Sequence, residues 1–423
     1  MELFPIQMLL AKVETTAGTD ASPTAASNNI PIKRGMAIEP DGNVIVRDIA
    51  DGGFAQIAGL TSMKSMTFKA VLELRGNRTT GVADDISKGA IGNLLDFDPI
   101  LRAADLTATY TAETSSGRRD GCVVYQPTIP SAEGVTLTVY GYSQTKVYKA
   151  VGCKVAITGV RFAAGNIALL EVEIRGAYSE IADATFPTTG VWPSTVPPVW
   201  AVAQRWNAQS VSPANSTDNI VLTDQALFRG NRVKFGGTVP AELTAGTWYY
   251  VRGTSQDFFQ LSTTLNGSLL SFTDDGTGVT LTSAGGFWLD GSTDLVCGAV
   301  NFNLGHVLTP REDGSRSSGL KGFMISGRQS TGDFMIESVT EATHALWADW
   351  AAGTVKTLHV DLGAVYGTGE TGSGNHIQIE AKVRLGRPTY SDASGKRMMN
   401  VPFNLALDAP GTIDGSEFKL IFQ

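Results

Sequence analysis

The sequence has few charged side chains and few residues suited to redox or metal chemistry. Asp, Glu, Lys and Arg make up 17% of its 423 residues, and it has three cysteines and four histidines. Cys122, Cys153 and Cys297 are far apart and odd in number, so their pattern indicates neither a disulfide framework nor a zinc site. We predict reduced thiols in the core, which fits assembly in a cytoplasm.

The sequence also lacks the segments that direct a chain into or across a membrane. No apolar run approaches the roughly 18 residues that a membrane span needs. The start, Met1-Glu2-Leu3-Phe4-Pro5, has an acid and a proline where a secretory signal has a basic region. We therefore expect a protein made without a cleavable export signal and without membrane insertion.

Basic clusters are absent as well. The formal net charge is −8, whereas a surface that holds nucleic acid needs clustered Lys and Arg to neutralise phosphates. This charge argues against a nucleic-acid-binding surface. It suits a surface that DNA must pass without adhering.

No catalytic pattern stands out. The sequence has no Gly-Lys-Ser phosphate loop, Gly-x-Ser-x-Gly elbow or His-Glu-x-x-His motif. The segment Asp274-Asp275-Gly276 could hold a cation, but a solvated turn is the simpler interpretation. A β-sandwich glycosidase would need two carboxylates about 5–10 Å apart, and no such pair is indicated. We expect no enzyme activity, no metal and no cofactor.

Two segments of the sequence show alternation of apolar and polar residues. In residues 66–75, apolar Phe68, Ala70 and Leu72 alternate with charged residues, which predicts a strand with one buried side. A polar, Gly-containing excursion precedes this strand. A second such excursion precedes the strand 333–339.

The elements that follow these two strands also repeat. A short helix is predicted near 91–104 and another over 341–353, where Gly353 provides a C-terminal stop. Further strands follow each helix, and 376–386 is expected to take the place of 172–176. The repeated order of arm, strand, helix, strand and long strand indicates an internal duplication.

A segment of different composition separates the two copies. Pro193, Pro197 and Pro198 indicate a stiff connector. Between 206 and 283, about five short strands alternate with Gly- and Asp-containing turns, which predicts a small β-sandwich or open barrel. It has no counterpart at the end of the second copy, so we interpret it as an insertion. The predicted domains are 1–203, 204–285 and 286–423.

Several of these stretches resemble a known family. The opening Leu9-Leu10-Ala11-Lys12-Val13-Glu14-Thr15-Thr16-Ala17-Gly18-Thr19-Asp20, the strand end Leu72-Glu73-Leu74-Arg75-Gly76 and the closing half resemble the two-domain kind of major tail tube protein of long, non-contractile-tailed bacteriophages. The resemblance covers roughly residues 1–200 and 287–423. The block between them resembles the small Ig-like modules that decorate phage tail proteins.

The resemblance implies a mainly β chain with two tandem tail-tube β-sandwich domains, each with a short helix, and an inserted all-β module. Inner sheets of neighbouring domains would join into a tube wall, so that trimeric rings with pseudo-six-fold symmetry stack into a virion tail. It also implies tape-measure, tail terminator and distal tail proteins as partners, and transient passage of DNA.

The resemblance also suggests roles for three sets of residues. A lumen through which DNA passes would be lined by the carboxylates Glu73, Glu171, Glu173 and Glu380, which in a lone monomer would form an ordinary solvated face. The arms 36–65 and 306–332 would order on assembly and make ring-to-ring contacts through Arg47, Asp48, Asp51, Arg311, Asp313 and Arg316. The insert would face outward, where it could contact the host surface through Trp248, Tyr249 and Tyr250.

The competing interpretation is a secreted or surface adhesin. In that protein the same aromatic residues of the middle module would be a sugar-stacking platform, although alternating aromatics in a strand are more often half core and half surface.

Overall fold

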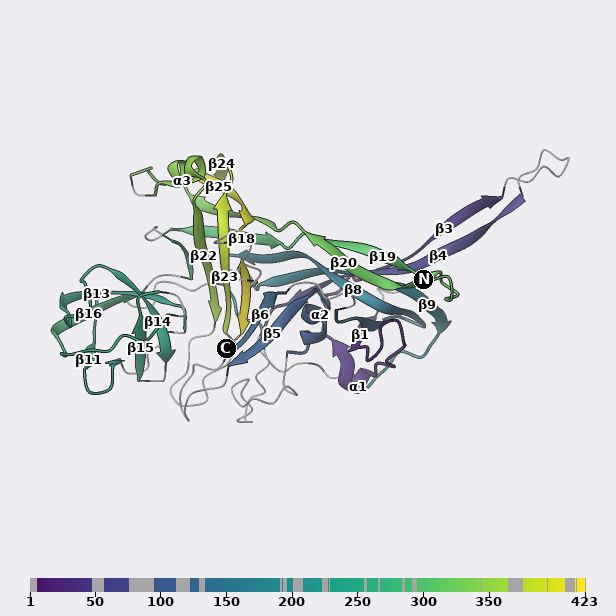
Figure 1. Cartoon of the computed structure of the whole chain (residues 1–423), viewed down its shortest axis with the longest axis horizontal. Coiled ribbons are helices and arrows are strands. Elements are labelled where there is room, and N and C mark those ends of the chain that lie inside the picture. Colours follow the sequence, from purple (N-terminus) through teal and green to yellow (C-terminus); the bar gives the residue numbers. More distant parts are fainter. Residues whose placement is uncertain are drawn as a thin grey trace.

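The structure is a computed structural model of the whole chain (Figure 1). It describes residues 6–47, 57–75, 95–111, 122–128, 134–190, 192, 196–200, 208–222, 227, 229–254, 257–264, 267–283, 286–290, 295–342, 344–363, 376–393, 395–407, 415 and 417–422. The chain is mainly β, as the sequence predicts.

The first half of the chain forms antiparallel β-sheet with one long projecting hairpin (Figure 1). Its elements are β1 (Gln7–Val13), α1 (Ala25–Asn28), β2 (Asn29–Ile30), β3 (Ala37–Arg47), β4 (Ile57–Glu73), α2 (Asp98–Ala103), β5 (Leu106–Thr111), β6 (Cys122–Pro127), β7 (Leu137–Ser143), β8 (Lys146–Ala163) and β9 (Leu169–Asp183). β9 lies between β4 and β8, and β7 joins β8 to β1. The hairpin of β8 and β9 turns through Gly165 at φ +77°, as its sequence predicts.

The second half contains β17 (Phe287–Leu289), β18 (Cys297–Asn303), β19 (His306–Glu312), β20 (Leu320–Arg328), β21 (Thr331–Glu337), α3 (Leu346–Ala352), β22 (Val355–Gly363), β23 (His376–Leu385), β24 (Thr389–Ala393), β25 (Lys396–Leu405) and β26 (Phe418–Phe422). Here β17 pairs with β22, β22 with β23, β23 and β24 with β25, and β25 with β21.

Strand pairing relates the two halves. β17 corresponds to β1 and β22 to β7, while β23 followed by β24 takes the place of the long strand β8. β25 and β26 together take the place of β9, because both run along this broken strand as β9 runs along β8. The prediction that 376–386 corresponds to 172–176 is therefore wrong. Residues 376–385 correspond to the first part of β8.

The helices are shorter than the sequence suggests. α3 begins at Leu346 rather than near residue 341, and it ends at Gly353, which has the left-handed φ of +65° expected of a C-terminal stop. α2 begins at Asp98 with proline in its first turn. Residues 91–94 of the predicted first helix lie outside the described residues.

One apolar core extends through both halves. It includes Phe68, Phe162, Phe302 and Phe334, each no more than 1% exposed. The segment between the halves forms a separate sheet with a core of its own, including Phe235, Phe259 and Leu281. Its strands are β10 (Gln209–Ser210), β11 (Ser212–Ala214), β12 (Asn219–Val221), β13 (Arg232–Thr238), β14 (Trp248–Thr254), β15 (Phe258–Ser262) and β16 (Thr277–Ser283). We call this segment the insert module.

Candidate functional site

The two halves are joined by direct strand pairing. β8 of the first half pairs with β18 of the second, with Ala163 opposite Ala299 and Val160 opposite Phe302. β6 pairs with β26 in the same way. One sheet therefore runs across the whole body in the order β3, β4, β9, β8, β18, β21, β25, β24. We call it the continuous sheet.

The continuous sheet ends in two unpaired edges among the described residues. β3 pairs only with β4, and β24 pairs only with β25. Thr389, Tyr390, Ser391 and Asp392 of β24 are exposed. Unpaired backbone N–H and C=O groups at a sheet edge are a template for another strand.

The second hairpin, β19 and β20, lies against the first half of its own chain (Figure 1). Leu320 and Phe323 are 2% and 5% exposed because they pack on Ala177, with Met63, Val151 and Leu308 around them. This hairpin is therefore not a free arm within the chain.

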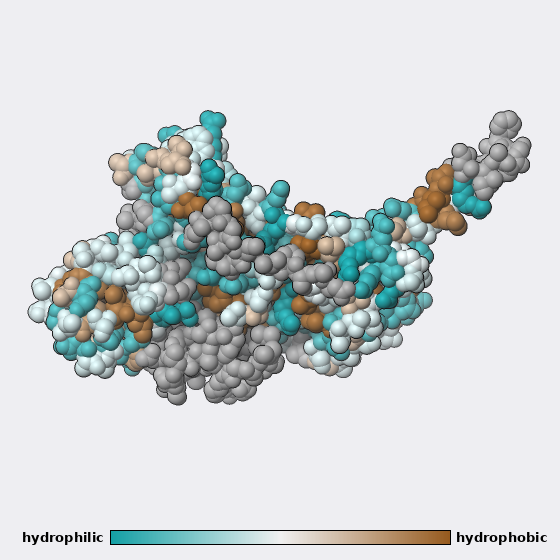
Figure 2. All heavy atoms as spheres, viewed as in Figure 1, coloured by the Kyte–Doolittle hydropathy of each residue, from teal (hydrophilic) through white to brown (hydrophobic). Residues whose placement is uncertain are grey.

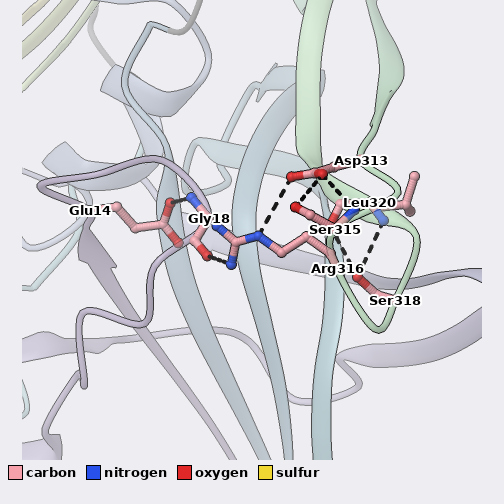
Figure 3. A network of polar contacts seen from close by, with 7 residues as sticks. All are labelled: Glu14, Gly18, Asp313, Ser315, Arg316, Ser318 and Leu320. Atoms are coloured by element: carbon pink, nitrogen blue, oxygen red, sulfur yellow. Dashed lines mark hydrogen bonds and ion pairs between the residues drawn. The ribbon is translucent and has the colours of Figure 1, made fainter.

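Polar contacts fix the tip of this hairpin (Figure 3). Arg316 Nη1 donates to the carbonyl of Gly18 at 3.0 Å, while Asp313 accepts from the hydroxyl and the N–H of Ser315. Glu14 stabilises the turn at Gly18, because its carboxylate accepts a hydrogen bond from the N–H of Gly18 at 2.7 Å. The tip thus contacts a buried carboxylate network of the first half.

The Glu14 carboxylate also accepts from the Gly152 N–H at 2.8 Å. A Cβ at Gly152 would lie 2.4 Å from the Lys321 carbonyl oxygen and 2.7 Å from Gly322 Cα. Backbones this close leave no room for a side chain. We call the surface around Gly152 and Ala177 the hairpin seat.

The first hairpin, formed by the distal parts of β3 and β4, contrasts with the second. It projects from the body as a long arm (Figure 1), and a hydrophobic patch covers part of it (Figure 2). Val44, Ile45, Val46 and Leu60 are 65%, 52%, 59% and 58% exposed. Of the residues predicted to act in this arm, Arg47 is exposed, whereas Asp48 and Asp51 lie outside the described residues.

The residues predicted in the other arm lie on or near the seated tip. Arg311 and Asp313 are half-buried and Arg316 is exposed. Arg316 contacts both Gly18 and, at 3.7 Å, Asp313. Arg316 therefore contributes to an attachment within one chain, and Asp313 contacts Arg316.

Three of the four predicted lumen carboxylates share one face of the continuous sheet, opposite the core. Glu73 lies on β4, and Glu171 and Glu173 lie on β9, alternating with buried residues. This face also carries cations, because Arg161 pairs with Glu171 at 2.8 Å and Arg175 with Glu173 at 2.5 Å. The face has mixed charge rather than a purely acidic character.

Glu380 does not join the other three carboxylates. It is 5% exposed on β23, opposite His359 of β22, and Gly230 of the insert module lies over it. The sequence suggested a solvated face here because charged and apolar residues alternate. The structure buries both faces because the insert module covers the outer one.

A shallow polar groove crosses the junction between the halves on the mixed-charge face. Its volume is about 510 Å³, and its lining includes Thr158, Arg161, Asn301, Thr331, Asp333 and Asn400. The Asn301 amide donates to the Asp333 carboxylate at 3.3 and 3.4 Å. Amides, hydroxyls, one Arg and one carboxylate in an open groove provide a hydrated surface rather than an enclosed ligand site.

The insert module docks on the second half through a buried aromatic and polar cluster. Arg232 is 6% exposed, and its guanidinium carbon lies 4.7 Å from the Trp288 ring centroid and 5.1 Å from that of Trp248. Trp288 stacks on His359 with the ring centroids 5.0 Å apart. Asn231 donates to Asp361, which also contacts His376. Burial lowers the pKa of Arg232 from its ordinary value.

Sequence reasoning missed this cluster. In β22, His359 and Asp361 alternate with the apolar residues Leu358, Val360 and Leu362, which in the sequence is the pattern of a strand with one solvated face, whereas the structure buries all five. Buried polar residues on the second face of a strand indicate that another element covers that face.

The three aromatic residues proposed for an external contact lie partly inside. Tyr249 belongs to the core of the insert module, Tyr250 packs against Trp288 with the ring centroids 5.7 Å apart, and Trp248 lies beside Arg232. They do not form a flat exposed platform, so the described geometry gives no support to sugar stacking here.

The described residues contain no group of three or more His, Cys, Asp and Glu side chains placed to hold a metal ion. Asp274 and Asp275 instead accept backbone N–H groups of Ala241, Gly276 and Asn215. Cys153 and Cys297 are free thiols, and burial raises the pKa of both. Within the described part of the chain, no helix has the length and hydrophobicity to cross a membrane.

In comparisons with known proteins, no protein-family model matches the chain and no curated protein matches its sequence.

Proposed function

We propose that this chain is a structural subunit that assembles with copies of itself into stacked rings and so forms a tube of the phage-tail kind. The observation that carries the proposal is the continuous sheet, in which two related halves are joined edge to edge and, among the described residues, each end has one unpaired edge. A sheet that has already joined two repeats has the geometry to join more.

The equivalence of the halves says which edges should meet. In the chain, β8 pairs with β18, the partner of β21. β24 corresponds to the distal part of β8, and β3 corresponds to β18 because it is the partner of β4. β24 of one copy should therefore pair with β3 of the next, and such head-to-tail pairing closes a ring when the rotation per copy allows it.

Three copies would place six related sandwiches in each ring, which is the arrangement that the sequence resemblance implies. The mixed-charge face would line the lumen. Among the described residues, ion pairs neutralise Glu171 and Glu173, whereas Glu73 and Asp333 are in no ion pair. Such a lined channel would enclose tape-measure protein and then let DNA pass without binding it.

The direct test is negative-stain electron microscopy of the purified full-length protein at high concentration. We expect hollow tubes or closed rings, with the insert module as a regular outer feature. Compact monomers at every concentration, also after addition of preformed tail tips as initiators, would contradict the proposal.

Proline substitutions in β24 test the edge itself. In a strand, the N–H groups of successive residues point to opposite edges, so of Ser391→Pro and Asp392→Pro one removes a free-edge donor and the other a donor to β25. We expect the variant that removes the free-edge donor to retain the parent melting temperature within about 2 °C and to form no tubes, because prolines are tolerated at a sheet edge but block pairing with another strand.

The other proline variant is the matched control. It should lower the free energy of unfolding by roughly 3 kcal/mol, because proline inside a ladder removes a hydrogen bond. If both variants kept the parent stability and still formed tubes, β24 would not be the assembly edge.

A further inference from the structure

We propose that the first hairpin of one copy docks on the second half of another copy, across β23 and residues 405–407. It would repeat between chains the docking of the second hairpin on the hairpin seat within the chain. The inference rests on the proposed function, because edge pairing brings the two surfaces together.

The first hairpin carries the side chains that such a docking needs. Ile45 and Leu60 lie opposite each other in the ladder, and both are more than half exposed. In the second hairpin, Leu308 lies opposite Ile325. Leu308 packs against the cluster of Ala177, Leu320 and Phe323, and Ile325 is 5% exposed. An exposed apolar hairpin of this kind indicates a missing partner surface.

The second half carries a counterpart of the hairpin seat. Leu169 of β9 and Met398 of β25 occupy equivalent positions, since they lie opposite Glu73 and Glu337, the last residues of β4 and β21. Eight residues further along, Ala177 therefore corresponds to Ala406.

The two alanines differ in their exposure to solvent. Ala177 is 1% exposed because the second hairpin lies on it. Ala406 is half-buried and the adjacent Leu407 is 37% exposed. The surface around Ala406 and Leu407, together with Lys382 of β23, is the acceptor that we assign to the first hairpin.

Topology decides that the hairpin comes from another copy. β3 and β24 lie at opposite ends of the continuous sheet, so the first hairpin points away from the acceptor of its own chain (Figure 1). The second hairpin leaves β18 and β21 and reaches across β8, the strand with which β18 pairs. A first hairpin whose β3 pairs with β24 of a second copy would reach across β23 and β25 of that copy.

Disulfide trapping tests the contact directly. Full-length Leu60→Cys and Leu407→Cys are mixed under assembly conditions, oxidised and run on a non-reducing denaturing gel. We expect a species of twice the chain mass in the mixture, at least tenfold above its level in either variant alone or in the parent with its native cysteines. Leu60→Cys mixed with Val221→Cys, an exposed position on the insert module, is the matched control.

The remaining outcomes of the crosslinking experiment distinguish failure of the docking from failure of the proposed function. Tubes by microscopy without the mixed crosslink would overturn the docking and leave the proposed function standing. Crosslinking of Leu60→Cys to itself would show that the hairpins meet tip to tip, which also overturns it. Absence of both tubes and crosslinks for all proteins, including the parent, would instead contradict the proposed function.

Removing the apolar side chains gives an independent readout. Ile45→Ser with Leu60→Ser should raise the protein concentration needed for tube formation at least tenfold without changing the monomer's melting temperature. Val221→Ser with Leu269→Ser removes two exposed apolar side chains of the insert module and should leave that concentration unchanged. Equal behaviour of the two double variants would overturn the docking.

Discussion

Gly152→Ala, a substitution in the hairpin seat, should lower the free energy of unfolding by about 2–5 kcal/mol, because it introduces left-handed backbone strain and overpacking. Gly152 has φ +58°, a conformation that costs a residue with a side chain about 1–2 kcal/mol. The new Cβ would also meet the Lys321 carbonyl oxygen at 2.4 Å. Because that contact is with backbone, relief requires the hairpin to move.

Gly165→Ala separates strain from contact. Gly165 has φ +77°, but no atom lies within 4 Å of the position that a Cβ would take. The Gly165→Ala variant should therefore lose only about 1–2 kcal/mol of the free energy of unfolding. Chemical denaturation measures both losses. Trypsin cleavage at Arg316 should accelerate in Gly152→Ala and not in Gly165→Ala, because only the first change lifts the second hairpin. Equal losses and equal cleavage would show that the second hairpin is not seated.

Acidification from pH 7 to pH 4 should lower the free energy of unfolding by roughly 3 kcal/mol for each of His306 and His359. Burial lowers the pKa of His359 from 6.5 to about 4, with smaller effects of His376 and Arg232 in the same direction and an opposing effect of Asp361. Burial and the nearby Arg328 likewise lower the pKa of His306 to about 4.

The direction follows from proton uptake. Between pH 6.5 and 4 the unfolded chain binds protons on these imidazoles and the folded chain does not, so stability falls as the pH falls through this window. Above pH 6.5 both states are neutral at these sites, and their contribution no longer changes. Denaturant titrations at several pH values measure the slope.

His359→Phe is the informative variant. Neither ring nitrogen of His359 has a hydrogen-bond partner among the described residues, and Phe preserves a ring against Trp288. The variant should lose about half of the acid sensitivity while keeping the stability at pH 7. The same pH slope in both proteins would show that His359 does not titrate on unfolding. Because His359 lies beneath the insert module, acid should loosen that attachment first.

Local patterns in the sequence determined the elements of this fold. Alternation around Phe68 and Leu72 predicted β4, the Ala163-to-Asn166 turn predicted the hairpin of β8 and β9, and Gly353 predicted the end of α3. These features depend on neighbours a few residues away, so a single sequence carries them. The repeated order of elements also indicated a duplication. The alignment of the two copies was predicted wrongly, because two strands, β23 and β24, take the place of the single strand β8 in the second half.

The tertiary structure alone decided which faces and edges meet. Nothing local to Val160 or Phe302 says that β8 pairs with β18, and nothing local to Leu320 says that it covers Ala177. Glu380 and Tyr250 follow the same alternating patterns as exposed residues, yet an element far away in the sequence packs against each of them. The sequence thus specifies strands with one apolar face, whereas burial of the second face and pairing of the edges depend on long-range contacts.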